Sequence, residues 1–367
     1  MAADPFRRSI RGLIPYQPGK PIEEVQRELG LEKVVKLASN EGPFPPFPAA
    51  IEAIGRAARD LNRYPDGGAY ALRTALAEHH GVAFEEVVVG GGADGVIDQL
   101  SQAALEEGDE IVCGWPSFPS YVLDALKIGA TVKKVPLRGH TYDLEAMRAE
   151  IGPRTKLVYV CHPNNPTGTA NGRAELLAFV ESVPPHVLTV LDQAYFEYVD
   201  DPDFADGVGE LFKAGRRVVV LRTFSKIYGL AGLRIGYGIA PVDVVEATSK
   251  VRRAFDVDAI AQAAALASIG DEDELARRRA LNAEGRAVLG ETLRANGLDP
   301  VGPALGNFLY AEVGDGAAMF DRLLHQGVIV RPLAGFGAPE AIRITVGTPE
   351  ENAFFADALG HVLTGVS

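Results

Sequence analysis

The sequence is poor in basic residues, in cysteine and in long apolar runs. It has 36 Lys and Arg against 49 Asp and Glu, so its formal net charge is −13. A protein with this charge repels a polyphosphate backbone, and no run of Lys and Arg is typical of a nucleic-acid-binding stripe. No stretch approaches the roughly 18 to 20 unbroken apolar residues of a membrane span, and the first residues lack the apolar core of a secretion signal. We therefore expect a cytoplasmic protein that associates with neither nucleic acid nor membrane.

The only two cysteines, Cys113 and Cys161, lie inside apolar runs that are typical of buried strands. No residues with the spacing of a zinc site accompany them, so we expect no bound metal. Because free cysteine is commonly buried, we interpret both thiols as core residues. The hydrophobic fraction of 47% and the charged fraction of 23% are those of a folded globular protein, and 367 residues suffice for about two domains.

Five apolar runs alternate with helical patterns between residues 84 and 240. The runs cover residues 86–89, 110–113, 156–161, 187–191 and 217–221. They are apolar on both faces rather than alternating, which indicates a mostly parallel sheet covered by helices on both sides. The sequence therefore predicts an α/β core.

The pattern changes towards the carboxyl end of the chain. Residues 271–296 are rich in Ala, Arg, Glu and Leu and predict a long connecting helix, whereas residues 307–313 and 341–346 predict strands. Residues 348–351, Thr-Pro-Glu-Glu, predict the capped start of a final helix. This region is interpreted as a second, α+β domain. The resulting division has an N-terminal arm joining the small domain (1–44), a large domain (45–270) and a small domain (271–367).

A glycine-rich turn, residues 90–95, follows the first predicted strand and opens a helix. It satisfies G-x-G-x-x-G, so a nicotinamide-dependent dehydrogenase has to be considered. That fingerprint needs an acidic residue at the end of the next strand, whereas Asp109 and Glu110 lie at its start. Two interpretations of this turn remain. It is either a phosphate site made by backbone N–H groups at a helix N-terminus or a plain tight turn.

Three polar motifs follow other predicted strands. Lys226 ends Thr-Phe-Ser-Lys and precedes Arg234, so its amine could form a Schiff base beside a bound phosphate. Taken alone, this motif is better explained by a solvated lysine. Asp192 ends a strand and faces the crevice where such folds bind ligands. A buried carboxylate there needs a cation, which a protonated pyridine nitrogen would supply. Residues 163–168, Pro-Asn-Asn-Pro-Thr-Gly, could be a turn only.

Taken in order, GGGAD (90–94), PNNPTG (163–168), LDQAY (191–195) and TFSKIYGLAGLR (223–234) resemble the motifs of the aspartate-aminotransferase superfamily. Segments 15–24, 36–41, 63–67, 330–332 and 342–351 further resemble the histidinol-phosphate aminotransferases. The resemblance covers nearly the whole chain. It implies the fold type I of pyridoxal-phosphate-dependent transferases: a large domain with a mostly parallel seven-stranded sheet sandwiched by helices, plus a smaller α+β domain.

The resemblance also implies pyridoxal 5'-phosphate as cofactor and three catalytic residues. Lys226 would hold the coenzyme as a Schiff base and shuttle the substrate proton. Asp192 would keep the pyridine nitrogen protonated, and Tyr195, together with Asn165, would hydrogen-bond the phenolic oxygen of the ring. The other implied coenzyme contacts are Gly92, Ala93, Asp94, Phe118, Thr223, Ser225, Arg234 and, from the neighbouring subunit of a homodimer, Tyr64.

For the substrates, the resemblance implies a binding set made of Tyr16, Asn40, Arg331 and Arg343. Arg343 would clamp the carboxylate of glutamate, and Arg331 with Tyr16 would bind a second anion. The implied reaction converts histidinol phosphate and 2-oxoglutarate into imidazole-acetol phosphate and glutamate by a ping-pong route in histidine biosynthesis. An aromatic amino-acid aminotransferase is the alternative; a decarboxylase of threonine phosphate and a non-catalytic coenzyme-binding module are more distant ones.

Three positions depart from the family pattern. Gln193 stands where the family usually has Glu, Gly42 where Asn is common, and Gly95 where Glu is frequent. None of these changes removes a group that is expected to touch the chemistry. They weaken the inference about substrate identity, because relatives that act on phenylalanine or tyrosine share the coenzyme motifs.

Overall fold

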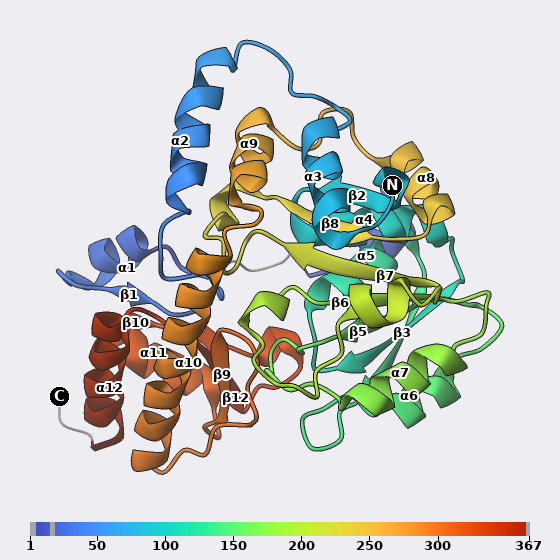
Figure 1. Ribbon diagram of the computed structural model, residues 1–367. Helices are drawn as coiled ribbons and strands as arrows, with labels where there is room; N and C mark the ends of the chain where they lie inside the picture. Colours follow the sequence, from blue (N-terminus) through green and yellow to red (C-terminus); the bar gives the residue numbers. More distant parts are fainter. Residues whose placement is uncertain (1–4, 15–18, 365–367) are drawn as a thin grey trace.

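The computed structural model describes residues 5–14 and 19–364 (Figure 1). Its largest sheet has seven strands in the order β2-β8-β7-β6-β5-β3-β4. The strands are β2 (Val87–Gly90), β3 (Glu110–Trp115), β4 (Thr131–Pro136), β5 (Thr155–Cys161), β6 (Leu188–Asp192), β7 (Val218–Thr223) and β8 (Gly236–Ile239). Only β8 runs antiparallel to its neighbours β2 and β7. The predicted, mostly parallel sheet is therefore present, with all five predicted runs in it.

Two strands of this sheet, β4 and β8, were not predicted from apolar runs, and the structure shows why. β4 lies at the edge of the sheet and carries Lys133 and Lys134, so only one of its six residues is buried. β8 is short and contains two glycines, Gly236 and Gly238, which lowers its strand propensity. The central strands β5, β6 and β7 are buried on both faces, as parallel sheets require.

Helices cover both faces of this sheet. Figure 1 shows α6 and α7 on one side and α3, α4 and α8 on the other. The helices of this part of the chain are α2 (Pro48–Ala57), α3 (Tyr70–His80), α4 (Gly92–Ala104), α5 (Pro119–Ile128), α6 (Leu144–Glu150), α7 (Arg173–Ser182), α8 (Val242–Val251) and α9 (Ala259–Ser268). Short 3₁₀ segments occur at Arg8–Ile10, Ala58–Asp60, Phe84–Glu86, Phe196–Tyr198 and Ala231–Leu233, and a π-helical turn at Gly207–Phe212.

Gly236 allows β8 to pack closely against the start of α4. A Cβ atom at this position would collide with the backbone of Gly92 and with the amide nitrogen of Ala93. Because backbone atoms cannot rotate away as a flexible side chain can, any larger residue would displace the first turn of α4. The glycine therefore helps to fix the amides of that turn relative to the sheet.

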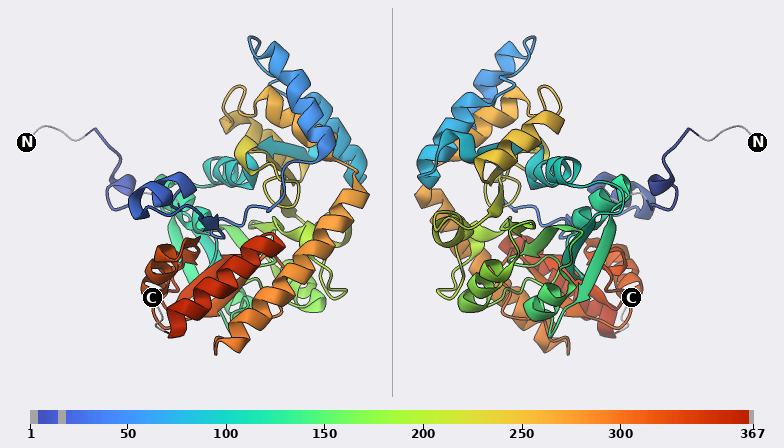
Figure 2. Two further views of the ribbon diagram at one scale, coloured as in Figure 1. Left: turned by 90° about the vertical axis from the view of Figure 1, so that its left-hand side faces the viewer. Right: turned by 90° about the vertical axis from the view of Figure 1, so that its right-hand side faces the viewer.

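The remaining elements form two smaller sheets with their own helices. β11 (Arg331–Pro332), β12 (Ala341–Thr345) and β9 (Phe308–Glu312) make an antiparallel sheet, and β1 (Val35–Lys36) pairs in parallel with β10 (Val328–Ile329). The helices here are α1 (Ile22–Leu29), α10 (Glu272–Ala295), α11 (Gly316–His325) and α12 (Pro349–Thr364), with a 3₁₀ turn at Ala334–Phe336. Figure 2 shows α12 lying along α10.

The structure contains both helices that the sequence predicts in this region. α10 begins one residue after Asp271, whose side chain accepts a hydrogen bond from the Glu274 amide. At α12, the Thr348 amide donates to Glu351 and the Glu351 amide donates to the Thr348 hydroxyl, which is the predicted capping box. Our division of the chain at residues 44 and 270 remains a proposal; β1, at residues 35–36, joins the part of the fold that contains β10.

Within the described ranges, no helix has the combination of length and apolar character that a membrane crossing would require.

Candidate active site

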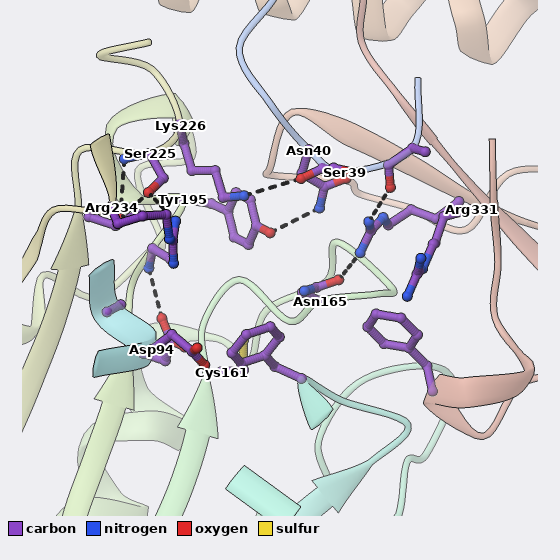
Figure 3. A pocket seen from close by; sticks show the side chains of 18 residues that line it. Ser39, Asn40, Asp94, Cys161, Asn165, Tyr195, Ser225, Lys226, Arg234 and Arg331 are labelled. Carbon is purple, nitrogen blue, oxygen red and sulfur yellow. Dashed lines mark hydrogen bonds between the residues drawn. The ribbon is translucent and has the colours of Figure 1, made fainter. Parts of the chain in front are cut away.

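A cavity of about 150 Å³ lies between the large sheet and the antiparallel three-stranded sheet (Figure 3). Asp192, Cys161 and Thr223 reach it from the carboxyl ends of β6, β5 and β7. Arg331 and Arg343 reach it from β11 and β12. Carboxyl ends of neighbouring parallel strands meet at one edge of a sheet, which is why motifs that are far apart in sequence converge here.

Most of the predicted site residues line this cavity. They are Asn40, Ala93, Asp94, Phe118, Asn165, Asp192, Tyr195, Thr223, Ser225, Lys226, Arg234, Arg331 and Arg343. Gly92 is adjacent: it has a φ of 83°, and a Cβ there would come within 2.8 Å of Arg234 Nη2. Tyr64 is elsewhere, 82% exposed and stacked on Phe255 with ring centroids 4.5 Å apart. Tyr16 lies outside the described residues.

Lys226 is held in the interior of the cavity. Its Nζ donates to the backbone carbonyl of Ser39 at 3.4 Å. Burial, with the positive charges of Arg343 and Arg234, lowers the pKa of Lys226 to about 7. The amine is therefore largely neutral at slightly alkaline pH, the state in which it can act as a nucleophile or accept a proton.

This lowered pKa predicts a pH profile for covalent labelling of Lys226 in the coenzyme-free protein. Only the neutral amine reacts with formaldehyde, so reductive methylation of Lys226 should rise with pH and reach half its maximum near pH 7. Peptide mass spectrometry would follow each lysine separately. Lys20 is an internal control, because Glu28 raises its pKa above 10.5. A Lys226 midpoint close to that of Lys20 would contradict the assignment.

Asp192 is buried at the floor of the cavity. Its Oδ2 accepts a hydrogen bond from the Tyr121 hydroxyl at 2.5 Å, and its Oδ1 accepts one from the Ala194 amide at 3.0 Å. Burial raises the pKa of Asp192, while the two donors partly offset that effect. A cation placed against this carboxylate would be strongly stabilised, because it would neutralise a charge that solvent cannot reach.

A corner of the cavity beside Lys226 is rich in hydrogen-bond donors. The first turn of α4 presents Ala93 and Asp94 to the cavity. The Thr223 hydroxyl donates to Ser225 Oγ at 3.0 Å, and Arg234 Nη1 donates to the same Ser225 oxygen at 3.4 Å. A helix N-terminus, two hydroxyls and a guanidinium together suit a phosphate group.

Two arginines form the opposite wall. Arg331 and Arg343 face each other in register across β11 and β12, and the Phe336 ring lies 5.7 Å and 5.5 Å from their Cζ atoms. Arg343 is 4% exposed and donates to the Ala38 carbonyl at 2.7 Å and to Asn165 Oδ1, both neutral acceptors. Like charges opposite each other in a sheet are unfavourable, so an anionic ligand between them would be stabilising.

Sequence reasoning missed several residues around this cavity. Ser39, Ala194 and Phe336 line it, and Tyr121 contacts Asp192 from behind. Cys161 is buried, as expected for a core residue, but it also lines the cavity because it ends β5 directly before the Pro-Asn-Asn-Pro-Thr-Gly loop. Its position at the end of a strand could have identified Cys161 as a cavity residue. No local sequence pattern could have identified Tyr121, because its partner Asp192 is 71 residues away.

None of the three departures from the family pattern is among the described residues that line the cavity. Gln193 turns into the core, where its Oε1 accepts from Arg222 Nη2 at 3.0 Å and its Nε2 donates to the Ala205 carbonyl at 2.8 Å. At Gly42, a Cβ would lie 2.7 Å from the Lys226 carbonyl oxygen. A Cβ at Gly95 would lie 3.4 Å from the carbonyl carbon of Gly90. The absence of a side chain at Gly42 and Gly95 therefore makes room for neighbouring backbone atoms, not for a ligand.

Residues 32–359 match the family described as aminotransferase class I and II. The chain is 45% identical to a histidinol-phosphate aminotransferase of Moorella thermoacetica, over 97% of this chain and 92% of the relative. It is 47% identical to one of Anaeromyxobacter sp., over 96% and 98% of the two chains. It therefore belongs to the class I and II aminotransferase family, and the prediction of a pyridoxal-phosphate-dependent aminotransferase is confirmed.

Solved structures agree with this assignment. The crystal structure of histidinol-phosphate aminotransferase from Sinorhizobium meliloti in complex with pyridoxal 5'-phosphate has a TM-score of 0.90 and 30% identity, covering 100% of this chain and 99% of that one. A Thermus thermophilus aspartate aminotransferase double mutant has a TM-score of 0.85 and 28% identity, covering 99% and 100%. The predicted fold type I is thereby confirmed.

Proposed function

We propose that this chain transfers an amino group from L-histidinol phosphate to 2-oxoglutarate, giving imidazole-acetol phosphate and glutamate. The observation that carries the proposal is the facing pair Arg331 and Arg343 on the wall across the cavity from the phosphate corner. Guanidinium groups bind carboxylate and phosphate alike, so one pocket could accept the carboxylate of glutamate and the phosphate ester of histidinol phosphate in turn. The names of the relatives with 45–47% identity support the same reaction.

The residues present fit pyridoxal 5'-phosphate. Asp192 offers a buried carboxylate for a protonated ring nitrogen, the corner at Ser225 and Arg234 offers donors for the phosphate, and Lys226 offers an amine between them. Phe118 lines the same space and would stack on the ring. When bound, the coenzyme supplies a conjugated ring that accepts the electrons of a broken Cα–H bond.

Proton movement falls to Lys226. With its pKa of about 7, Nζ would take up the proton from the α-carbon of the amino donor and hold it for return to the bound coenzyme. Tyr195 is buried beside it and receives a hydrogen bond from Asn40 Nδ2 at 2.9 Å. This bond leaves the Tyr195 hydroxyl hydrogen available to the phenolic oxygen of the coenzyme. Asn165, held by Arg343, would approach the same oxygen.

Arg331→Gln tests the proposed substrate. A charge-assisted hydrogen bond contributes about 1.5–3 kcal/mol, so kcat/KM for histidinol phosphate should fall about 10- to 150-fold. L-Phenylalanine has no phosphate, and its only anion is the carboxylate that Arg343 would clamp, so its kcat/KM should change by less than about threefold. An equal loss for both donors would contradict phosphate recognition by Arg331.

The decarboxylase alternative has its own test. Carbon dioxide release without any 2-oxo acid would indicate a decarboxylase.

A homodimer, with Tyr64 reaching the phosphate of the neighbouring subunit's coenzyme, is also part of the proposal. Helices α2, α3 and α9 lie together at the top of Figure 1, and large exposed apolar side chains occur on them and on the segments next to them. They are Ile51, Leu61, Tyr64, Tyr70, Phe255 and Leu266. Apolar clusters of this kind mark protein–protein contacts. A cytoplasmic location remains part of the same proposal.

Mixed dimers test this arrangement. Lys226→Ala and Tyr64→Ala protomers, co-expressed with different affinity tags, would give a hybrid in which one site is intact and the other carries both changes. The hybrid should be more active than either parent dimer. Activity equal to the mean of the two parents would contradict a contribution from Tyr64 across an interface.

A further inference from the structure

Asp192 accepts a hydrogen bond from a tyrosine that does not line the cavity. Tyr121, on α5, is fully buried, and its hydroxyl donates to Asp192 Oδ2 at 2.5 Å. The other carboxylate oxygen, Oδ1, accepts from the Ala194 amide at 3.0 Å. Each oxygen thus has one protein donor, while the carboxylate still lines the cavity.

The Tyr121 ring is fixed by its aromatic neighbours. It stacks on Tyr159 of β5 with ring centroids 4.4 Å apart and planes 12° apart. Phe118, which lines the cavity, meets its edge at 5.6 Å. Because both contacts must break before the ring can turn, the hydroxyl cannot leave the carboxylate without disturbing the core.

The chemistry of the pair favours one arrangement of the proton. Burial and the nearby carboxylate raise the pKa of Tyr121 well above 10, so the phenol stays protonated and always donates. A donor to the charged form of a carboxyl stabilises that form. The groups that face Asp192 are Tyr121 from α5, the Ala194 amide, Lys226 after β7, Asp94 from α4, Cys161 and Tyr159 from β5, and Tyr195 after β6. Among them, Tyr121 is the side chain whose hydrogen bond to the carboxylate lowers its pKa.

We propose that Tyr121 is a positioning residue of this aminotransferase: its hydroxyl holds Asp192 ionised and aimed at the ring nitrogen of pyridoxal phosphate. The proposal rests on the coenzyme and not on the identity of the amino donor, so coenzyme binding alone can test it. Tyr159 supplies a matched comparison. It is equally buried in the same ring stack, but its hydroxyl faces Ser101 Oγ at 3.4 Å instead of Asp192.

Tyr121→Phe and Tyr159→Phe should be compared as coenzyme-free proteins titrated with pyridoxal phosphate, and their thermal unfolding should be recorded. A hydrogen bond to a charged acceptor is about twice as strong as one to a neutral acceptor. Coenzyme affinity should therefore fall roughly tenfold in Tyr121→Phe and stay within about twofold of wild type in Tyr159→Phe. The unfolding temperatures would show how far each substitution destabilises the coenzyme-free protein.

The pH profile separates positioning from a merely structural role. Without the Tyr121 donor, Asp192 becomes protonated at higher pH, so the acid-side loss of coenzyme affinity should begin at higher pH in Tyr121→Phe. The profile of Tyr159→Phe should match wild type. In an Asp192→Asn background, Tyr121→Phe should have almost no further effect on affinity, because its charged partner is gone. An unchanged profile in Tyr121→Phe, the same shift in both variants, or full additivity with Asp192→Asn would overturn the proposal.

Discussion

Lys226→Ala is expected to abolish amino transfer without unfolding the protein. A positioned general acid–base group alone contributes about 10²- to 10⁴-fold to a rate, and this variant also loses the only amine placed in the described cavity. The fold should persist, because the charged form of this buried lysine is disfavoured in the native state. Its native pKa of about 7 lies below the ordinary 10.5, so ionisation of this amine opposes folding at neutral pH, and removing the amine takes away that unfavourable contribution.

Steady-state assays and unfolding curves would measure the two parts of this prediction. Lys156→Ala is a suitable control, since Lys156 is exposed and lies 3.9 Å from Asp109 in a surface ion pair. Such pairs contribute little, so this variant should keep wild-type activity. Lys226→Ala retaining more than about a tenth of wild-type turnover would exclude Lys226 as the proton-transfer group.

Asp192→Asn should weaken coenzyme binding and kcat/KM together, by about a hundredfold to several thousandfold. The substitution keeps the size of the side chain but leaves a ring cation without its buried counter-charge, and breaking such a pair costs about 3–5 kcal/mol. The Tyr121 hydroxyl and the Ala194 amide also lose their charged acceptor.

A buried carboxyl outside the cavity provides the comparison for Asp192. Burial raises the pKa of Asp124 to about 6, and this residue pairs with Lys127 on α5 at 2.6 Å. Asp124→Asn should leave coenzyme affinity within about threefold of wild type. If equilibrium titration gave the same loss for both variants, general disturbance of the core would explain it better than a role of Asp192 at the ring.

The sequence indicated most of the residues that line the cavity, but not the residues that support them. Lys226 and Asp192 stood out because each lies at the end of an apolar strand, and a parallel sheet brings such positions to one edge. Their roles, and the role of Arg234, came from the family resemblance. Tyr121 and Phe336 were missed because they come from a helix face and a short turn, where a buried aromatic residue resembles any core residue. Their roles depend on contacts across the fold that no local pattern encodes.

The prediction of strands from the sequence was limited in the same way. β5, β6 and β7 were predicted because both of their faces are buried, whereas β4 and β8 lacked apolar runs. β4 is an edge strand whose lysines discourage pairing with other chains. At β8, glycine is required for contact with α4, so packing selected a residue that strand propensity disfavours.

The most direct test of the account is a single-turnover experiment with the coenzyme-loaded protein. The protein would be mixed with L-histidinol phosphate or, separately, with L-phenylalanine, and the coenzyme spectrum followed as it changes to the pyridoxamine form. We expect fast conversion with histidinol phosphate and much slower conversion with phenylalanine. Equal or faster conversion with phenylalanine would contradict the proposed substrate, although the assignment of Lys226 and Asp192 to the coenzyme would stand.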